Sequence, residues 1–373
     1  MRDRVKRLLL NVVAAIVAGV FAGGVTSLIL LARGDSPSFV ISQMWDYGTT
    51  ASSELTIVNS ATVYFFSAIA VAIGFRMNLF NIGVDGQYRL AAMMAGAFAG
   101  SVALPNGLRQ IATILVAMLV GAAWAGLVAL LKVYRGVSEV ISTIMLNFIA
   151  TSLIAYLMRP SFFGQRAPNS EDVTTKPIPG SGQVTGLDLI PNSGGKVYGL
   201  IILALIVGVV FQFVLGRTRF GFDLRATGRS VTAAQASGVN VRRMIVVSLL
   251  LSGAVAGLVG MPILLGSSHS FSAVTFQTGL GFTGIAIALL GRNTPVGIAF
   301  ASLLWAFLDQ SSTILDLNEI PKEIVQITQG VVVLSVVIAY EVVRRVVLVQ
   351  EQRRVGRALA APTTAPAAAE VGA

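Results

Sequence analysis

The chain has 373 residues, of which 55% are hydrophobic and only 12% are charged, and its formal net charge is +10. A soluble domain carries about a quarter charged residues, so this composition argues against a soluble protein and favours a membrane protein built from helices. With no cysteine and a single histidine, His269, the chain lacks the side chains for a disulfide, a thiolate metal site or a histidine-based metal cluster, and we expect neither a metal nor a cofactor.

Ten apolar segments are predicted to form transmembrane helices, which makes the fold an all-α integral membrane protein. They are 8–31, 56–75, 90–104, 111–131, 137–157, 197–215, 244–265, 280–290, 296–308 and 324–343. The first segment follows a basic start, MRDRVKR, but is too long for the apolar core of a signal peptide, so we expect a retained span. Segments 90–104, 280–290 and 296–308 are short for a bilayer, which is typical of interrupted or tilted helices.

The stretch 79–87, LFNIGVDGQ, combines two helix-breaking glycines with the polar side chains of Asn81, Asp85 and Gln87. A spanning chain tolerates polar groups and interrupted backbone only inside the bundle or beside a water-filled path. Two interpretations stay open for this stretch. It lines a path for a polar solute, or it is a surface loop between two spans.

A polar stripe follows in the stretch 138–147, SEVISTIMLN, where Glu139, Thr143 and Asn147 recur at four-residue spacing. That spacing places the three side chains along one face of a helix, and such a face should point into the bundle. The stripe either lines the substrate path or forms a seam of hydrogen bonds between helices.

We expect a transmembrane domain over residues 1–349 and a disordered cytoplasmic tail over residues 350–373, which are rich in Ala and Pro. The domain divides into halves at about 8–158 and 197–345, with five segments each. An odd number of spans per half would invert one half relative to the other. The outer loop between them, 159–196, is rich in Pro, Gly and Ser, and is either a disordered connector or a docking surface for an external partner.

The loop 216–243 carries six arginines against one aspartate, which predicts a cytoplasmic position by the positive-inside rule. Ser230 is predicted to cap a short helix over 231–237, and Gly238 to end it in the left-handed conformation. A short helix of small residues suits the groove of another protein. The alternative is an ordinary basic loop that contacts lipid headgroups.

The remaining cations predict topology and do not indicate a nucleic-acid partner. Basic clusters precede the first segment and follow the fourth and the tenth. An even number of spans with both termini in the cytoplasm places all of these clusters inside. Asp309 falls at the outer end of the ninth segment, where we expect a solvated surface role.

Four motifs in this order resemble a known family. They are LFNIGVDGQ, SEVISTIMLN, GFDLRATGRSVTAAQASGV with the following LSGAVAGLVG, and GFTGIAIALLGRNTPVG. They are similar to the permease subunits of bacterial ABC importers, in the nucleoside and simple-sugar branch of the sugar and branched-chain amino acid permease family. The resemblance covers about residues 56–343.

The resemblance implies a non-catalytic permease subunit of an ATP-driven importer in the bacterial inner membrane, which takes up nucleosides or related sugar-bearing solutes. Its implied partners are cytoplasmic ATP-binding subunits, a second permease of the same or a related kind, and an extracytoplasmic substrate-binding protein or lipoprotein. The stretch 81–87 would line the solute path. The stretch 225–238 would be the helix that couples to the ATPase, with the candidate residues Arg225, Gly228, Ala233, Ala234 and Gly238.

Other functions remain open at this point. The solute could be a simple sugar or a branched-chain amino acid. The chain could instead be a secondary carrier driven by an ion gradient, with Asp85 or Glu139 as the proton site, or a membrane scaffold that transports nothing. No G-x-x-x-x-G-K-[ST] motif occurs, so this chain does not bind ATP through a P-loop.

Overall fold

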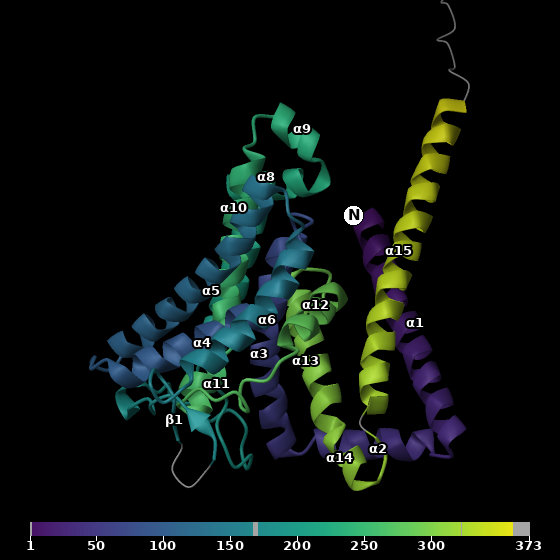
Figure 1. Ribbon diagram of the computed structural model, residues 1–373. Helices are drawn as coiled ribbons and strands as arrows, with labels where there is room; N and C mark the ends of the chain where they lie inside the picture. Colours follow the sequence, from purple (N-terminus) through teal and green to yellow (C-terminus); the bar gives the residue numbers. More distant parts are fainter. Residues whose placement is uncertain (1, 167–170, 322, 361–373) are drawn as a thin grey trace, which may run out of the picture.

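The apolar segments of the sequence are helical in the computed structural model, which describes residues 2–166, 171–321 and 323–360 (Figure 1). The helices are α1 (Arg2–Arg33), α2 (Pro37–Gly48), α3 (Ala51–Phe75), α4 (Val84–Ser101), α5 (Leu108–Arg135), α6 (Glu139–Leu157), α7 (Ile201–Arg217), α8 (Arg219–Arg229), α9 (Val231–Ala236), α10 (Val241–Leu258), α11 (Met261–Ile263), α12 (Leu280–Leu290), α13 (Pro295–Ser311), α14 (Thr313–Leu317) and α15 (Glu323–Ala360). Two strands, β1 (Gln165–Arg166) and β2 (Val173–Thr174), pair antiparallel. A 3₁₀ turn, η1 (Gly180–Gly182), and a π-helical turn, η2 (Leu264–Ser268), complete the described elements.

The all-α prediction is confirmed, and each of the ten predicted segments overlaps a helix. Seven helices in the described residues are long and apolar enough to cross a membrane, which makes this a multi-pass membrane protein. An eighth span arises if α7 and α8, bent by 73° at their junction, are taken together. The short α12 coincides with the predicted segment 280–290. The count of about ten spans and the inversion of the halves stay predictions.

Helix α3 lies at the centre of the bundle. In its most apolar stretch of 18 residues 78% are buried, against 28% in that of α5 and 22% in that of α6. This burial explains why the part of α3 after Tyr64 is apolar on nearly every side: α3 is surrounded by α4, α7, α10, α12 and α13. Helices α5 and α6 instead present apolar side chains outward, as helices that face lipid do.

Glycines let α5 and α10 approach closely. A Cβ atom at Gly253 would lie 2.4 Å from the carbonyl oxygen of Gly121, and one at Gly257 would lie 2.1 Å from that of Ala117. Both distances are too short for any side chain, so the two backbones are in contact. This contact holds the long α10 against the rest of the bundle.

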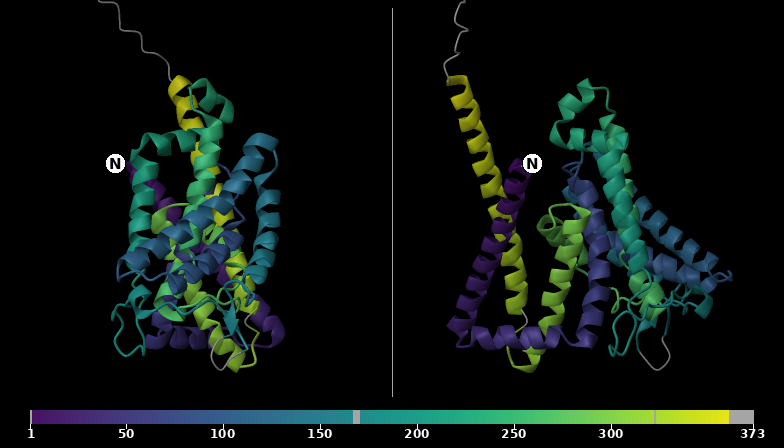
Figure 2. Two further views of the ribbon diagram at one scale, coloured as in Figure 1. Left: turned by 60° about the vertical axis from the view of Figure 1, so that its left-hand side comes forward. Right: turned by 180° about the vertical axis from the view of Figure 1, so that it is seen from behind.

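Helices α1 and α15 pack along each other and stand beside the main bundle, as the right view of Figure 2 shows. The Thr26 and Thr328 hydroxyls, 2.9 Å apart, form a hydrogen bond between them. Helix α2 runs across the end of the molecule and joins this pair to α3 (Figure 2). Helix α15 continues to Ala360, and so includes the first part of the predicted tail; residues 361–373 lie outside the described residues.

The loop 159–196 packs onto the bundle over its described part. Backbone N–H groups of Thr175, Ile178 and Val184 donate to carbonyl oxygens between residues 265 and 271. Of the two interpretations for this loop, a disordered connector therefore does not fit the described residues. The loop lies at the same end of the bundle as α2 and α14, opposite α9 (Figure 1).

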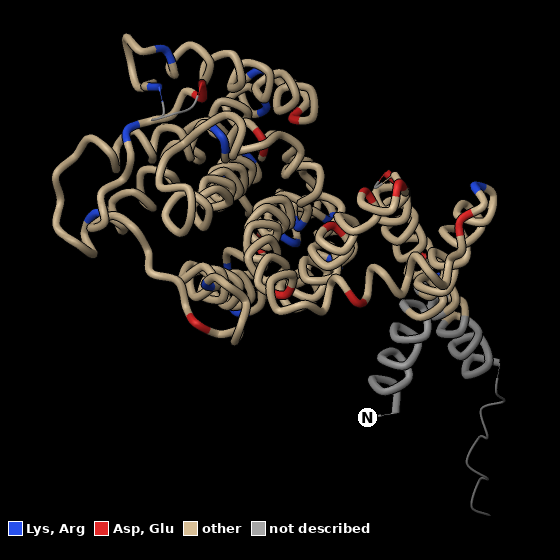
Figure 3. The backbone as a smooth tube through the Cα atoms, turned by 90° about the horizontal axis from the view of Figure 1, so that it is seen from below, with Lys and Arg blue, Asp and Glu red and all other residues tan. Residues whose placement is uncertain are grey.

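Charged residues are sparse along the helices (Figure 3). The predicted short helix is confirmed as α9: the Ser230 hydroxyl accepts a hydrogen bond from the Ala233 N–H at 3.3 Å, and Gly238 has a φ of 80°. The sequence did not predict α8 before it, which begins where the Thr218 hydroxyl accepts from the Gly221 N–H at 3.1 Å.

Candidate functional site

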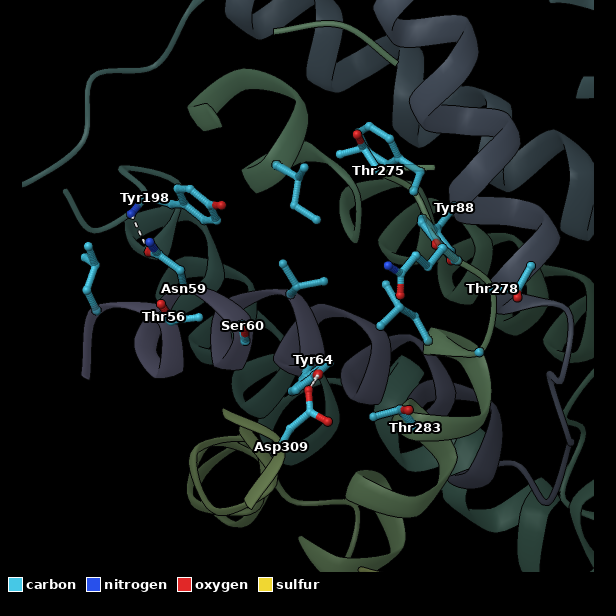
Figure 4. Close-up of a pocket in the computed structure, with 17 residues that line it drawn as sticks. Thr56, Asn59, Ser60, Tyr64, Tyr88, Tyr198, Thr275, Thr278, Thr283 and Asp309 are labelled. Atoms are coloured by element: carbon cyan, nitrogen blue, oxygen red, sulfur yellow. Dashed lines mark hydrogen bonds between the residues drawn. The ribbon is translucent and has the colours of Figure 1, made fainter. Parts of the chain in front are cut away.

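A polar cavity of about 420 Å³ opens between α3, α13 and the segment that leads into α12 (Figure 4). Its lining residues from α3 lie in the first half of that helix, and its lining residue from α13 lies in the last turns of that helix. The cavity therefore lies towards the end of the bundle that carries α2 and α14 (Figure 1).

One wall of the cavity is a polar face of α3. Thr56, Asn59, Ser60 and Tyr64 recur at helical spacing and line the cavity together (Figure 4). The Asn59 side-chain oxygen accepts a hydrogen bond from the Tyr198 N–H at 2.7 Å, which holds the segment around Tyr198 against this wall. The Tyr198 ring thereby closes one side of the cavity.

The opposite wall is the segment 275–280, which three residues of α4 hold in place. The Asp85 carboxylate accepts hydrogen bonds from the N–H of Gly279 (3.0 and 3.1 Å) and of Gly281 (3.2 Å). Arg89 Nε donates to the Phe276 carbonyl at 3.0 Å, and the Tyr88 hydroxyl donates to the Gln277 carbonyl. Asp85 also lies at the amino end of α12, where a negative charge complements the helix dipole.

The cavity combines aromatic rings with polar groups, one of which, the carboxylate of Asp309, is charged. Its 17 lining residues offer hydroxyl, amide and backbone groups together with the rings of Tyr64, Tyr88, Tyr198 and Phe276. Aromatic faces suit sugars and planar bases, and hydroxyl and amide groups orient them. Among the described residues, no group of three or more His, Asp or Glu side chains could hold a metal ion.

The predicted residues Asn81 and Gln87 pair with each other. Each side-chain amide donates to the other's oxygen at 3.0 Å, and Asn81 also donates to the Ser252 hydroxyl at 2.8 Å. Asn147, on α6, accepts from the Gly86 N–H at 2.9 Å and donates to the Ile82 carbonyl at 3.0 Å. The polar groups at the helix break before α4 thus find hydrogen-bond partners in side chains from three helices.

The rest of the predicted polar stripe lies next to this cluster. Thr143 is buried, donates to the Glu139 carbonyl at 2.7 Å and faces Gly83. Glu139 forms an ion pair with Lys132 of α5. The structure therefore brings Asn81, Gln87, Thr143 and Asn147 together, while none of the six predicted path residues lines the cavity itself. Their contact with solute stays a prediction.

The residues that line the cavity were not among the predicted path residues, and three of them, Asn59, Tyr64 and Asp309, make hydrogen bonds at its wall. Asp309 is exposed, as expected of a solvated residue, and it also lines the cavity and accepts a hydrogen bond from the Tyr64 hydroxyl at 2.8 Å (Figure 4). The signal on α3 was available, because its polar residues have the same helical spacing that identified the stripe on α6. The position of Asp309 depends on how α13 packs against α3, which no local pattern shows.

At the other end of the molecule, the candidate coupling residues differ in what they face. Ala234 is buried, whereas Ala233 and Gly238 are exposed. Gly228 packs directly on the chain after α3, since a Cβ there would lie 2.6 Å from the Arg76 carbonyl oxygen and 3.0 Å from Met77 Cα. Helix α8 therefore contacts the segment that leads to the helix break.

Arg76 links the segment after α3 to the turn that follows α12. Its guanidinium Nη2 donates to the Asn293 carbonyl at 2.6 Å, in the turn between α12 and α13. Burial lowers the pKa of Arg76, and the nearby positive charge of Arg225 lowers it further. The candidate coupling residue Arg225 is therefore close enough to Arg76 for the two charges to interact.

Comparison with known proteins identifies related chains over most of this length. The profile of the family described as branched-chain amino acid transport system / permease component matches residues 54–337. The guanosine ABC transporter permease protein NupP of Bacillus subtilis is 34% identical over 349 residues, which cover 91% of this chain and 96% of NupP. No solved structure matches the chain.

Two further relatives differ in the solutes for which they are named. The nucleoside ABC transporter permease protein NupB of Lactococcus lactis is 27% identical over 91% of this chain and 93% of its own. The glucose ABC transporter permease protein TsgB13 of Haloferax volcanii is 31% identical over 87% of this chain and 86% of its own.

Proposed function

This chain belongs to the family of branched-chain amino acid transport system permease components, and on that premise we propose that it is the membrane subunit of an ATP-driven importer of nucleosides. The observation that carries the solute class is its relatedness, over nearly the full length of both chains, to permeases named for guanosine and for nucleosides. The cavity supports the same class, because it combines aromatic rings with neutral hydrogen-bonding groups.

We propose that the cavity and the helix break are two positions along one solute path. The cavity lies at the end with α2 and α14, which we assign to the outer face of the inner membrane. The arginine-rich end with α8 and α9 is then cytoplasmic, as are both termini. The part of the path at the helix break would be bordered by Asn81, Asp85, Gln87, Glu139, Thr143 and Asn147. The permease domain would have about ten spans in two inverted halves.

The chain is proposed to carry no catalytic residues and to take its energy from ATP-binding subunits. Helices α8 and α9 would dock on these subunits, with Arg225, Gly228, Ala233, Ala234 and Gly238 at or behind the contact. A difference in how the ATPase binds α9 in its open and closed states would provide the required link. A second permease and an external binding protein would complete the importer.

Reconstitution tests this proposal. The chain is placed in proteoliposomes with its ATP-binding subunits and binding protein, and uptake of labelled guanosine, glucose and leucine is measured. We expect guanosine to accumulate only when all subunits and ATP are present. The glucose permease among the relatives favours a sugar as the second candidate, and accumulation of glucose without guanosine would select it. Uptake by this chain alone would contradict the proposed function.

A further inference from the structure

Asp309 is the one formally charged side chain among the residues that line the cavity. It lies in the last turns of α13, and its Oδ2 accepts a hydrogen bond from the Tyr64 hydroxyl of α3 at 2.8 Å. No hydrogen bond from a described residue reaches its other carboxylate oxygen. Figure 4 shows the carboxylate beside Tyr64 at the cavity wall.

The surroundings of this carboxylate determine what it can bind. No lysine, arginine or histidine lines the cavity, so no cation offsets the negative charge there. A carboxylate oxygen accepts hydrogen bonds from N–H and O–H groups, and a charged acceptor binds them more strongly than a neutral one. The same charge repels an anion, and because Asp309 is exposed, water screens part of this repulsion.

Some of the other polar groups around the cavity are already engaged. Asn59 binds the backbone of Lys196 and Tyr198, and the Tyr198 hydroxyl is 3.1 Å from the Ser267 hydroxyl. The Thr56 hydroxyl donates to the Ser52 carbonyl within α3. Because it alone is charged, Asp309 is the strongest acceptor among the described side chains that line the cavity.

We propose that Asp309 is a specificity-determining contact, which accepts a hydrogen bond from an uncharged nucleoside and excludes its phosphorylated form. Tyr64 is the positioning residue, because its hydroxyl holds one carboxylate oxygen, whereas no hydrogen bond from a described residue reaches the other. This assignment rests on the proposed function. It adds to that function a physical reason why nucleosides would pass and nucleotides would not.

The substitution Asp309→Asn tests the charge while nearly preserving the shape of the side chain. The full chain is placed in lipid nanodiscs without other subunits, so that no binding protein selects the solute. Binding of labelled guanosine is measured, with guanosine 5′-monophosphate as competitor. We expect guanosine to bind about tenfold more weakly to the variant, the change expected when a charge-assisted hydrogen bond becomes a neutral one. The preference for guanosine over its monophosphate should also fall.

Two further variants separate specificity from stability. Asp46→Asn makes the same chemical change at an exposed carboxylate on α2 that does not line the cavity, and should leave guanosine binding and the preference unchanged. Tyr64→Phe keeps the charge but removes its positioning donor. It should weaken guanosine binding and still exclude the monophosphate.

Three outcomes overturn the assignment of Asp309. They are an unchanged preference in Asp309→Asn, an equal loss for both solutes, and no guanosine binding to the unmodified chain. The proposed function fails by a different measurement, namely absence of guanosine uptake by the complete importer. If the importer takes up guanosine while Asp309→Asn leaves the preference intact, only the role of Asp309 is wrong.

Discussion

At the scale of single residues, Asp85 is the side chain that joins the predicted motif to the cavity. It lies in the first turn of α4, after the helix break, and its carboxylate accepts hydrogen bonds from the N–H of Gly279, in the cavity wall, and from that of Gly281, just after it. The sequence identified Asp85 as polar in an apolar context but could not supply its partner, since the two sites are 194 residues apart. The sequence therefore indicated a polar motif at this position but not its contacts.

Asp85→Asn should loosen the cavity wall. The substitution replaces a charged acceptor with an amide whose NH₂ cannot accept, and hydrogen bonds to charged groups contribute about 1.5–3 kcal/mol each. We expect faster hydrogen exchange at the amides of residues 279–281 and slower guanosine uptake by the complete importer. The exposed Asp46→Asn is the matched control. Unchanged exchange at 279–281 would show that Asp85 does not hold this wall.

Gly228 makes a close backbone contact that leaves no room for a side chain. A methyl group at this position would lie 2.6 Å from the Arg76 carbonyl oxygen, so Gly228→Ala must move α8 away from the chain after α3. Overpacking of this kind costs about 1–3 kcal/mol. We expect fewer guanosine molecules imported per ATP hydrolysed.

Gly216→Ala is the matched control for Gly228→Ala. A Cβ atom at Gly216 meets no heavy atom within 4 Å, so the same chemical change is made in open space on the neighbouring helix. Transport per ATP should stay at the level of the unmodified chain. Equal guanosine uptake per ATP in both variants would mean that the contact of α8 with Arg76 and Met77 does not link ATP hydrolysis to transport.

At the scale of elements, the sequence was most reliable where the signals are local. Ser230 and Gly238 predicted both ends of α9, because a capping hydroxyl and a left-handed glycine act within a few residues. Helix α8 was missed because Arg219–Arg229 lacks an apolar run, and its stability comes from packing against the chain after α3. The cavity was missed for a related reason, since α3, α13 and the 275–280 segment meet only in the folded chain.

The two alanines of α9 should behave differently when replaced by glutamate. Ala233 is exposed, so Ala233→Glu should leave the protein folded in the membrane while it disturbs the proposed ATPase contact and lowers uptake per ATP. Ala234 is 2% exposed, so Ala234→Glu would bury an unpaired charge and lower the thermal stability of the chain itself. The melting temperature in detergent, measured beside coupled uptake, distinguishes the two. Equal losses of stability would contradict the orientation of α9.

At the scale of the whole molecule, the structure places two sites at opposite ends of a helical bundle. The cavity lies at the end with α2 and α14, and the arginine-rich α8–α9 segment lies at the other (Figure 1). Between them, α8 contacts the chain after α3, which leads through the helix break to α4, and α4 holds the cavity wall. This continuous set of contacts would connect movement at the proposed ATPase contact to the cavity that we propose as the solute site.

We expect nucleoside transport by this chain to be driven by ATP and not by an ion gradient. The complete importer is placed in proteoliposomes that contain ATP, and labelled guanosine uptake is measured with and without an ionophore that abolishes the proton gradient. We predict the same rate of uptake in both conditions, and loss of uptake when a non-hydrolysable ATP analogue replaces ATP. Uptake that stops with the ionophore while ATP hydrolysis continues would contradict the claim, and would identify the chain as a secondary carrier.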